Sequence, residues 1–332
     1  MPKPASLNRR ELMAGAALAA TTLAAAPSIS QENSAPVDLS GKSVLITGCS
    51  SGFGRLTAEH CARLGAKVFA TMRNLPRPEA DELAALASDE GLDIQVIEID
   101  VTSEEQVEAG VAAALEATGG TLDVLVNNAG IAISGPIEAQ DIEATRLIFE
   151  TNVFGPQRLI RAVMPSMRAA GSGQIFNVSS QLGRVIIPGI GQYSPTKFAL
   201  EALSEQLAYE VVQHGVDVTI IEPGGYPTKI WANQAPLSGD LKARLPEELV
   251  KSYPALTSRM GIGGGGGSTD PMDIPRAIVE IIAMPAGQRP LRREVHPDRR
   301  PQEAINEVSS QTQLAMLGDT PFGPWAKDVH NA

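Results

Sequence analysis

The chain has 332 residues, of which 43% are hydrophobic, and this proportion excludes a disordered chain and allows a large core. Its 27 Lys and Arg against 38 Asp and Glu give a net charge of −11, which argues against nucleic-acid binding, where clustered cations neutralise phosphates. Two cysteines and four scattered histidines exclude a disulfide scaffold and a Cys-rich metal site, so no metal is expected. No apolar run reaches the ~20 residues of a membrane span.

The first 36 residues are typical of an export leader rather than of a folded element. Arg9 and Arg10 precede an uncharged run over 12–26, as in a signal peptide. The arginine pair resembles a twin-arginine export motif, and Ala24–Ala26 offers a cleavage site. We therefore expect a periplasmic protein exported by a twin-arginine route. A cytoplasmic protein with an Ala-rich tail is the alternative.

From residue 37 onward, short apolar runs alternate with helix-length amphipathic stretches. The predicted strands cover 44–47, 67–72, 94–99, 124–127, 174–179 and 216–222. The helical stretches between them include 53–64, 103–117, 140–169 and 196–213. Because the strand segments are nearly continuous runs of Val and Ile, we expect them to be covered on both faces. The pattern predicts a doubly wound parallel α/β sheet, a Rossmann fold, as one catalytic domain over 37–332.

The alternation weakens after residue 228. A helix is expected over 240–252 and another from 268 to 284, followed by an edge strand over 290–295. Gly263–Gly267 predicts a flexible loop within a substrate-loop region of about 226–270, with a lid hinge as the alternative. Five arginines lie between 289 and 300 with acidic residues interspersed, which predicts a solvated or subunit-contact surface.

A glycine-rich turn over 48–54 joins the first predicted strand to the first helix. In this context backbone N–H groups approach a pyrophosphate, and the helix N-terminus adds partial positive charge. The turn has the spacing TGxxxGxG, with Gly48, Gly52 and Gly54 as its glycines. This spacing resembles the classical short-chain dehydrogenase/reductase family. The sequence at the end of the second predicted strand and the sequence of the glycine-rich turn are similar to those on the hydroxysteroid-dehydrogenase side of that family.

The end of the second strand bears on the choice between NAD and NADP. About twenty residues after the glycines, an NAD site would carry an acidic residue for the ribose hydroxyls. This chain has no carboxylate there, and Arg73 can pair bidentately with a 2′-phosphate. Ser50 or Ser51 can donate to the same phosphate. The sequence therefore predicts NADP, with a solvated Arg73 as the alternative.

Three further motifs match the family, so the resemblance spans roughly 41–295. Asp100-Val101 resembles its adenine contact, Asn127–Gly130 matches its NNAG motif, and Pro223–Thr228 matches the PGxxxT that covers the nicotinamide. The cofactor-binding residues that the resemblance implies are Gly48, Ser50, Ser51, Gly52, Phe53, Gly54, Arg73, Asp100, Val101, Asn128, Ala129, Gly130, Tyr193, Lys197, Pro223, Gly224 and Thr228.

Tyr193 and Lys197 stand at positions i and i+4 and share one face of a helix. A free phenol has a pKa near 10, and a nearby ammonium should lower the pKa of Tyr193. Ser180 lies thirteen residues before the tyrosine at the end of the fifth strand, where strand alternation turns Ser179 to the other face. With Asn152, these residues match the catalytic positions of the family in order and spacing.

The resemblance implies hydride transfer between NADP(H) and a carbonyl or secondary alcohol, with Tyr193 as general acid/base. Ser180 would hydrogen-bond the reacting oxygen, Lys197 would also bind the nicotinamide ribose, and Asn152 would hold a relay water. A dinucleotide-binding regulatory protein without turnover is one alternative. A lyase or epimerase that uses the same tyrosine is another.

The substrate is a small-molecule carbonyl or alcohol whose identity the sequence leaves open. Tyr226, Trp231 and Leu237 either line a pocket for a bulky apolar carbonyl or pack as ordinary core residues. We also expect a homodimer or homotetramer.

Overall fold

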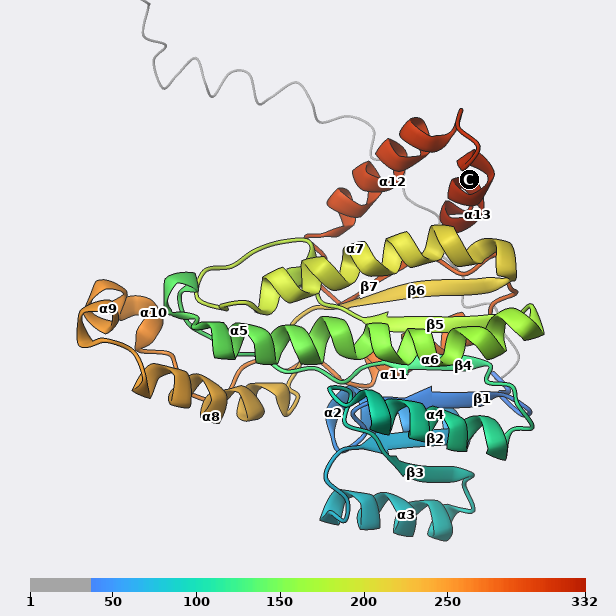
Figure 1. The fold of residues 1–332 in the computed structure, drawn as a ribbon, viewed down its shortest axis with the longest axis horizontal. Coiled ribbons are helices and arrows are strands. Elements are labelled where there is room, and N and C mark those ends of the chain that lie inside the picture. Colours follow the sequence, from blue (N-terminus) through green and yellow to red (C-terminus); the bar gives the residue numbers. More distant parts are fainter. Residues whose placement is uncertain (1–36) are drawn as a thin grey trace, which may run out of the picture. The chain divides into compact units, whose positions relative to one another are not determined.

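The computed structural model describes residues 37–332, which form a seven-stranded parallel sheet in the order β3-β2-β1-β4-β5-β6-β7 (Figure 1). The strands are β1 (Ser43–Ile46), β2 (Lys67–Met72), β3 (Ile94–Glu98), β4 (Val124–Asn127), β5 (Gly173–Val178), β6 (Val216–Pro223) and β7 (Arg292–Val295). The doubly wound Rossmann fold predicted from the sequence is confirmed. The expected leader over 1–36 lies outside the described residues.

Two layers of helices sandwich this sheet because its strands are apolar on both faces. In β1, Val44 and Ile46 pack into one core and Leu45 packs into the other, and all three are fully buried. One face is covered by α2 (Gly52–Arg63), α3 (Pro78–Glu90) and α11 (Asp273–Ala283). The other face is covered by α4 (Glu104–Ala117), α6 (Gly155–Ala170) and α7 (Tyr193–Val211).

The helix predicted over 140–169 is interrupted. It consists of α5 (Ile142–Phe149), a π turn η2 (Glu150–Phe154) and α6. A Cβ on Gly155 would lie 2.8 Å from a methyl carbon of Val101, so the missing side chain allows a close approach there. Pro156 then lacks the backbone N–H that a continuous helix would use. Both residues favour a break, and the break carries Asn152.

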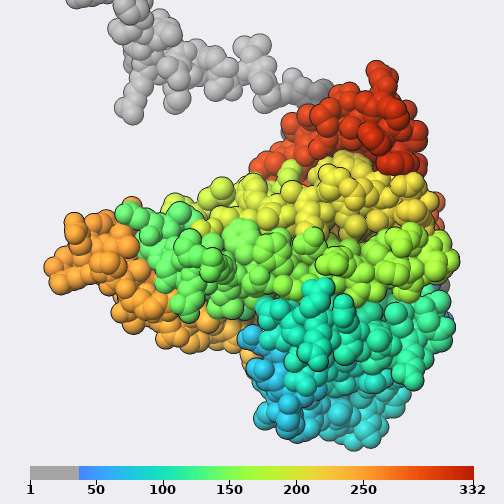
Figure 2. Space-filling model, in the orientation of Figure 1, coloured from blue at the N-terminus to red at the C-terminus, as the bar shows by residue number. Residues whose placement is uncertain are grey.

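Three helices lie beyond the carboxyl ends of the strands, namely α8 (Ile230–Ala243), α9 (Glu247–Ser252) and α10 (Pro254–Thr257) (Figure 1). Figure 2 shows this segment, in orange, against the green surface that includes α5. Ile148 of α5 joins Leu241 and Met260 in a separate apolar cluster. The single helix predicted over 240–252 was therefore wrong, because Pro246 cannot continue α8 and instead precedes α9.

The last strand and two C-terminal helices complete the described chain. β7 lies at the edge of the sheet, as expected, and α12 (Glu303–Leu317) and α13 (Gly323–His330) follow it. Four short turns of helix, three of them 3₁₀ turns, connect the larger elements: η1 (Ile137–Ala139), η2, η3 (Gln181–Gly183) and η4 (Val212–His214). Within residues 37–332, every helix is too short or too polar to cross a membrane.

The solvated surface predicted for the arginines between 289 and 300 was wrong for two of them. Arg289 pairs with Asp217 at 2.7 Å, and the side chain of Arg292 is only 6% exposed. Both arginines face carboxylates that are distant in sequence, so the local charge pattern could not reveal the pairing.

Candidate active site

The glycine-rich turn closes because a side chain would not fit at two of its glycines. Gly48 has a φ of +75°, and a Cβ there would lie 2.9 Å from the Cα of Ala129. A Cβ on Gly54 would collide with the side-chain amide of Asn128 and the carbonyl oxygen of Gly48. The glycines therefore allow the end of β1, the start of α2 and the end of β4 to meet closely.

Asn128 and Thr47 lock this turn with hydrogen bonds. The side-chain amide of Asn128 donates to the carbonyl of Thr47 at 2.8 Å. The hydroxyl oxygen of Thr47 accepts from the backbone N–H groups of Asn128 and Ala129, each at 3.0 Å. The NNAG segment thus fixes the shape of the turn, and its Ala129 and Gly130 also line the cavity described next.

A cavity of about 580 Å³ runs along the carboxyl ends of the strands from the glycine turn to α8. Every cofactor residue predicted from the sequence lines this cavity except Gly54, whose role is to let the turn close. Among the predicted catalytic residues, Ser180, Tyr193 and Lys197 line it, and Asn152 does not.

The three candidate catalytic residues that line the cavity lie close to one another, and burial shifts the pKa values of Tyr193 and Lys197. Lys197 Nζ donates to the carbonyl of Val178 at 2.8 Å and lies 5.7 Å from the ring centroid of Tyr193. Burial raises the pKa of Tyr193 to about 12, against a lowering by the hydrogen bond with Ser180. Burial also lowers the pKa of Lys197 to about 8, while Glu201 raises it. The expected lowering of the Tyr193 pKa was therefore wrong, because burial raises the pKa by more than the hydrogen bond with Ser180 lowers it.

Asn152 lies behind the cavity wall. Its Oδ1 accepts from the N–H of Ile131 at 2.9 Å, and its Nδ2 donates to the Ile131 carbonyl at 2.9 Å and to the Thr196 hydroxyl at 3.1 Å. A Cβ on Gly130 would lie 3.3 Å from Asn152 Oδ1 and 3.8 Å from Lys197 Nζ, so both groups lie close to this glycine. The asparagine thus ties η2 to the 131 segment and to α7.

Ser179 and Ser180 have different surroundings. The hydroxyl of Ser180 accepts from the N–H of Leu182 at 3.1 Å and is hydrogen-bonded with Tyr193. The Oγ of Ser179 lies beside Gly183, where a Cβ would be 2.7 Å from this oxygen and 3.0 Å from Cγ of Glu201. Both serines line the cavity, against the expectation that strand alternation turns Ser179 away, but only Ser180 is hydrogen-bonded with Tyr193, whereas the hydroxyl of Ser179 faces the carboxylate of Glu201.

Arginines gather at the adenosine end of the cavity. Arg73 is exposed at the end of β2, and Ser50 and Ser51 lie in the turn opposite. Sequence reasoning missed Arg77, which lines the same cavity and whose Nη1 donates to the carbonyl of Arg73 at 3.3 Å. Its Nε also pairs with Glu79 at 2.9 Å. The signal available in the sequence was a second arginine four residues after the first.

Asp100 and Val101, the predicted adenine contact, both line the cavity. The carboxylate of Asp100 accepts from the N–H of Thr102 at 2.9 Å and from its hydroxyl at 2.7 Å, so it is held by the chain itself. Val101 packs closely against Gly155, at the break between η2 and α6.

The opposite end of the cavity is apolar. Trp231 and Leu237 line it from α8, and Tyr226 lines it while remaining 2% exposed. The hydroxyl of Tyr226 donates to Asp273 at 3.1 Å, and its ring packs edge-on against Phe53 with centroids 5.5 Å apart. Tyr226 is thus chiefly a core residue, whereas the other two face the cavity.

Two isoleucines of this wall were not foreseen. Ile187 and Ile190 line the cavity from the segment between η3 and α7, and Ile187 is also 51% exposed. Apolar residues in a segment without regular structure were the only sequence signal.

The glycine run is a loop, as expected, and it lies against the substrate end. A Cβ on Gly265 would lie 3.2 Å from the Trp231 ring, and one on Gly266 would collide with the carbonyl oxygen of Tyr226. Gly264, Gly265, Gly266 and Gly267 all have positive φ. The absence of side chains therefore lets this loop cover Trp231 closely.

A glycine-rich turn between β1 and α2, together with a Ser–Tyr–Lys group at the same sheet edge, defines a dinucleotide-dependent oxidoreductase with a Rossmann fold. Residues 42–237 match the family model "short chain dehydrogenase", and the chain belongs to this family. It acts on an alcohol or carbonyl with a nicotinamide cofactor. The cavity fits such a cofactor, since glycines at 48 and 54 leave the space that a Cβ would fill.

Relatives with known names support this assignment. Retinol dehydrogenase 8 of Homo sapiens is 33% identical, with 82% of this chain and 87% of the relative covered. The mitochondrial D-beta-hydroxybutyrate dehydrogenase of Mus musculus is 33% identical over 73% of this chain and 74% of its own length. A solved short-chain dehydrogenase from Streptomyces avermitilis is 32% identical, covers 83% of this chain and 96% of its own, and has a TM-score of 0.65.

Proposed function

We propose that the protein is an NADP(H)-dependent carbonyl reductase or alcohol dehydrogenase with Tyr193 as its general acid/base. The observation that carries this proposal is the grouping of Ser180, Tyr193 and Lys197 in one cavity with the glycine turn. NADPH, when bound, supplies the hydride that reduces a carbonyl carbon. Ser180 donates a hydrogen bond to the carbonyl oxygen and stabilises the charge that develops there.

Tyr193 donates a proton to the same oxygen. Its pKa of about 12 means that the phenol is protonated at neutral pH, which suits the acid of a reduction. Lys197, with a pKa of about 8, is mostly an ammonium at pH 7 and holds positive charge beside the reacting group. Reduction is therefore the direction we propose.

The test of this function is NADPH consumption with a panel of ketones and aldehydes of graded size. Because the substrate end is apolar, we expect kcat/KM to rise with the apolar bulk of the substrate. The Tyr193→Phe variant keeps the ring and should lose nearly all turnover while it still binds NADPH. A purified wild-type protein that binds NADPH but turns over no member of the panel would favour the regulatory alternative.

The preference for NADP over NAD is part of this proposal and is supported by Arg73. Arg73 is exposed and lines the cavity together with Ser50 and Ser51, and no carboxylate ends β2. The Arg73→Leu variant should lose about 1.5–3 kcal/mol of NADPH binding, roughly 10- to 150-fold in Kd, with little change for NADH. Arg161→Leu, at a 71% exposed arginine of α6, is the control. An unchanged NADPH/NADH ratio in Arg73→Leu would contradict the preference.

We also propose that the protein is exported to the periplasm, on the strength of Arg9-Arg10 before the uncharged run. Replacing both arginines by lysine keeps the charge and should leave the protein in the cytoplasm, as cell fractionation would measure. Cytoplasmic protein beginning at Met1 in the wild type would contradict export.

A homodimer or homotetramer is proposed as well. Exposed apolar side chains at Leu147 (40%) and Phe154 (42%), at the end of α5 and in η2, support a contact between subunits. Light scattering of the purified protein tests this, and a monomer would contradict it.

A further inference from the structure

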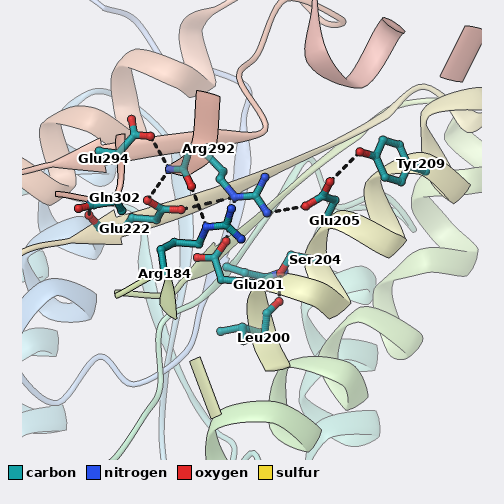
Figure 3. A network of polar contacts seen from close by, with 12 residues as sticks. Arg184, Leu200, Glu201, Ser204, Glu205, Tyr209, Glu222, Arg292, Glu294 and Gln302 are labelled. Carbon is teal, nitrogen blue, oxygen red and sulfur yellow. Dashed lines mark hydrogen bonds and ion pairs between the residues drawn. The ribbon is translucent and has the colours of Figure 1, made fainter. Parts of the chain in front are cut away.

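A buried group of charged side chains from α7, β6 and β7 takes no direct part in the proposed reaction (Figure 3). Arg292 of β7 is at its centre. Its Nε donates to Glu201 at 2.9 Å and its Nη2 donates to Glu205 at 2.6 Å, both on α7. The side chains of Arg292 and Glu201 are 6% and 2% exposed. This ion pair is therefore almost fully removed from water. A charge that is buried in this way needs a close partner of opposite charge.

The same group is connected to the strand end that carries part of the cofactor site. Glu222, immediately before Pro223, lies with its Oε1 3.5 Å from Arg292 Nε. Asn306 of α12 donates from Nδ2 to Glu222 at 2.8 Å, and Arg184 Nε donates to Asn306 Oδ1 at 2.8 Å. Asn306 is also the one buried residue of α12, so this polar contact holds the C-terminal helix to the site.

Glu201 is the member of the group that lies nearest to the catalytic residues along the chain. It follows Lys197 by four residues on α7, so both side chains lie on one helix face, and both are buried. Glu201 Oε1 and Ser179 Oγ both lie beside Gly183, and a hydrogen bond with Ser179 lowers the pKa of the Glu201 carboxyl. Glu201 thus lies one helical turn after Lys197 on α7 and close to Gly183, which follows the strand end that carries Ser180.

We propose that Glu201 is a positioning residue of this enzyme, whose carboxylate, anchored by Arg292, keeps Lys197 in its ammonium form beside Tyr193. This inference rests on the proposed function, because it assigns the ammonium the supporting role described above. Glu201 touches neither substrate nor cofactor and acts only through Lys197.

The electrostatic surroundings agree with this role. The pKa of Lys197 is lowered to about 8, because burial lowers it by more than the charge of Glu201 raises it. Burial has the largest effect and raises the pKa of Glu201, while the charge of Arg292 and its hydrogen bond oppose this rise and favour the carboxylate form. The titratable or charged groups that face this pair, from each element packed against it, are Tyr193 and Glu205 on α7, Arg184 after η3, Glu222 on β6, and Arg292 and Glu294 on β7.

Glu205 provides a matched control on the same helix. It is paired with the same Arg292, but it lies one turn further from Lys197 and accepts from the hydroxyl of Tyr209 at 2.7 Å. Glu201→Gln and Glu205→Gln therefore remove the same charge from the same ion-pair group. They differ in the distance of that charge from Lys197.

The first test is the pH dependence of kcat for carbonyl reduction, with KM measured alongside. In Glu201→Gln the alkaline limb of the kcat profile should move to lower pH by about one unit, since a unit charge nearby shifts a pKa by roughly that much. The KM for NADPH should change little. Glu205→Gln should leave the limb in place, and Glu201→Asp should restore most of it. If the alkaline limb lies at the same pH in the Glu201→Gln and Glu205→Gln variants, the proposal is overturned.

The second test needs no turnover, so it separates failure of this inference from failure of the proposed function. NMR of the protein labelled at lysine, assigned with Lys197→Arg, follows the titration of Lys197 directly. At the wild-type midpoint, we expect the ratio of ammonium to free amine at Lys197 to fall about tenfold in Glu201→Gln and to change much less in Glu205→Gln. An unshifted Lys197 in Glu201→Gln would overturn the role even if the wild type reduces no substrate of the panel.

A second pair of variants applies if Glu201→Gln does not fold because Arg292 is left with too little negative charge. Adding Arg292→Gln to each single substitution removes the unpaired cation. The two doubles then differ only in which glutamate remains. Lys197 should titrate at lower pH in the double that lacks Glu201, and identical titrations would contradict the proposal.

Discussion

Adjacent serines with different neighbours give a direct test at the residue scale. Ser180→Ala removes a donor to the developing charge on oxygen, and we expect kcat to fall by about 10²-fold or more. Ser179→Ala removes a hydroxyl that faces Gly183 and Glu201, and we expect kcat to change by less than about fivefold. Steady-state kinetics on one ketone measures both. The reverse order of the two effects would show that the serine was wrongly chosen.

Other properties of single residues could not be read from the sequence. Resemblance to the family in the order and spacing of its motifs pointed to Ser180, Tyr193 and Lys197. The pKa of Tyr193 depends on how far the fold buries it, which no motif states. The partners of Arg292 are about 70 to 90 residues away along the chain, so its burial was equally invisible.

At the scale of elements, the strands were predictable and the C-terminal helices were not. The predicted segments over 67–72 and 124–127 coincide with β2 and β4, because a strand covered on both faces is a continuous apolar run. α12 buries only Asn306, so it has no apolar stripe to reveal it. The break at η2 likewise depends on the close approach of Gly155 to Val101, which is a contact between distant segments.

The glycine run gives a prediction at this scale. Gly266→Ala would push against the carbonyl of Tyr226 and should move the loop off Trp231, which lines the substrate end. We expect KM for a bulky apolar ketone to rise about tenfold, with KM for NADPH nearly unchanged. Gly267→Ala is the control, because it has a positive φ but meets no atom within 4 Å. If both variants give the same KM, the loop does not shape the pocket.

For the whole molecule, alternation of strands and helices was enough to predict a doubly wound parallel sheet. Right-handed crossovers place each successive parallel strand, so a βαβ pattern leaves few sheet orders open. The sequence also placed the site at the carboxyl edge of the sheet, where such folds bind ligands. It did not indicate that α7, β6, β7 and α12 meet in one buried charged group, since each contributes isolated polar residues to it.

That group makes global stability depend on pH through Glu222. Burial, and next the charge of Glu201, raise the pKa of Glu222 to about 8 in the folded chain, from an ordinary value of 4.5. The folded state therefore binds this proton more tightly than the unfolded state does. Its contribution to the free energy of unfolding is complete below about pH 4.5 and is lost as the pH rises through about 8.

Glu222→Gln cannot lose a proton, so it should not share this loss. We expect the Tm of the wild type to fall relative to that of the variant by several degrees between pH 6 and pH 8.5, because ~1 kcal/mol moves the Tm of a domain this large by about 2 °C. Thermal unfolding followed by circular dichroism at both pH values measures the difference, and other titrating groups cancel in it. If the Tm of the wild type and the Tm of the variant change by the same amount between the two pH values, Glu222 is already ionised at pH 6, held by Arg292 and Asn306.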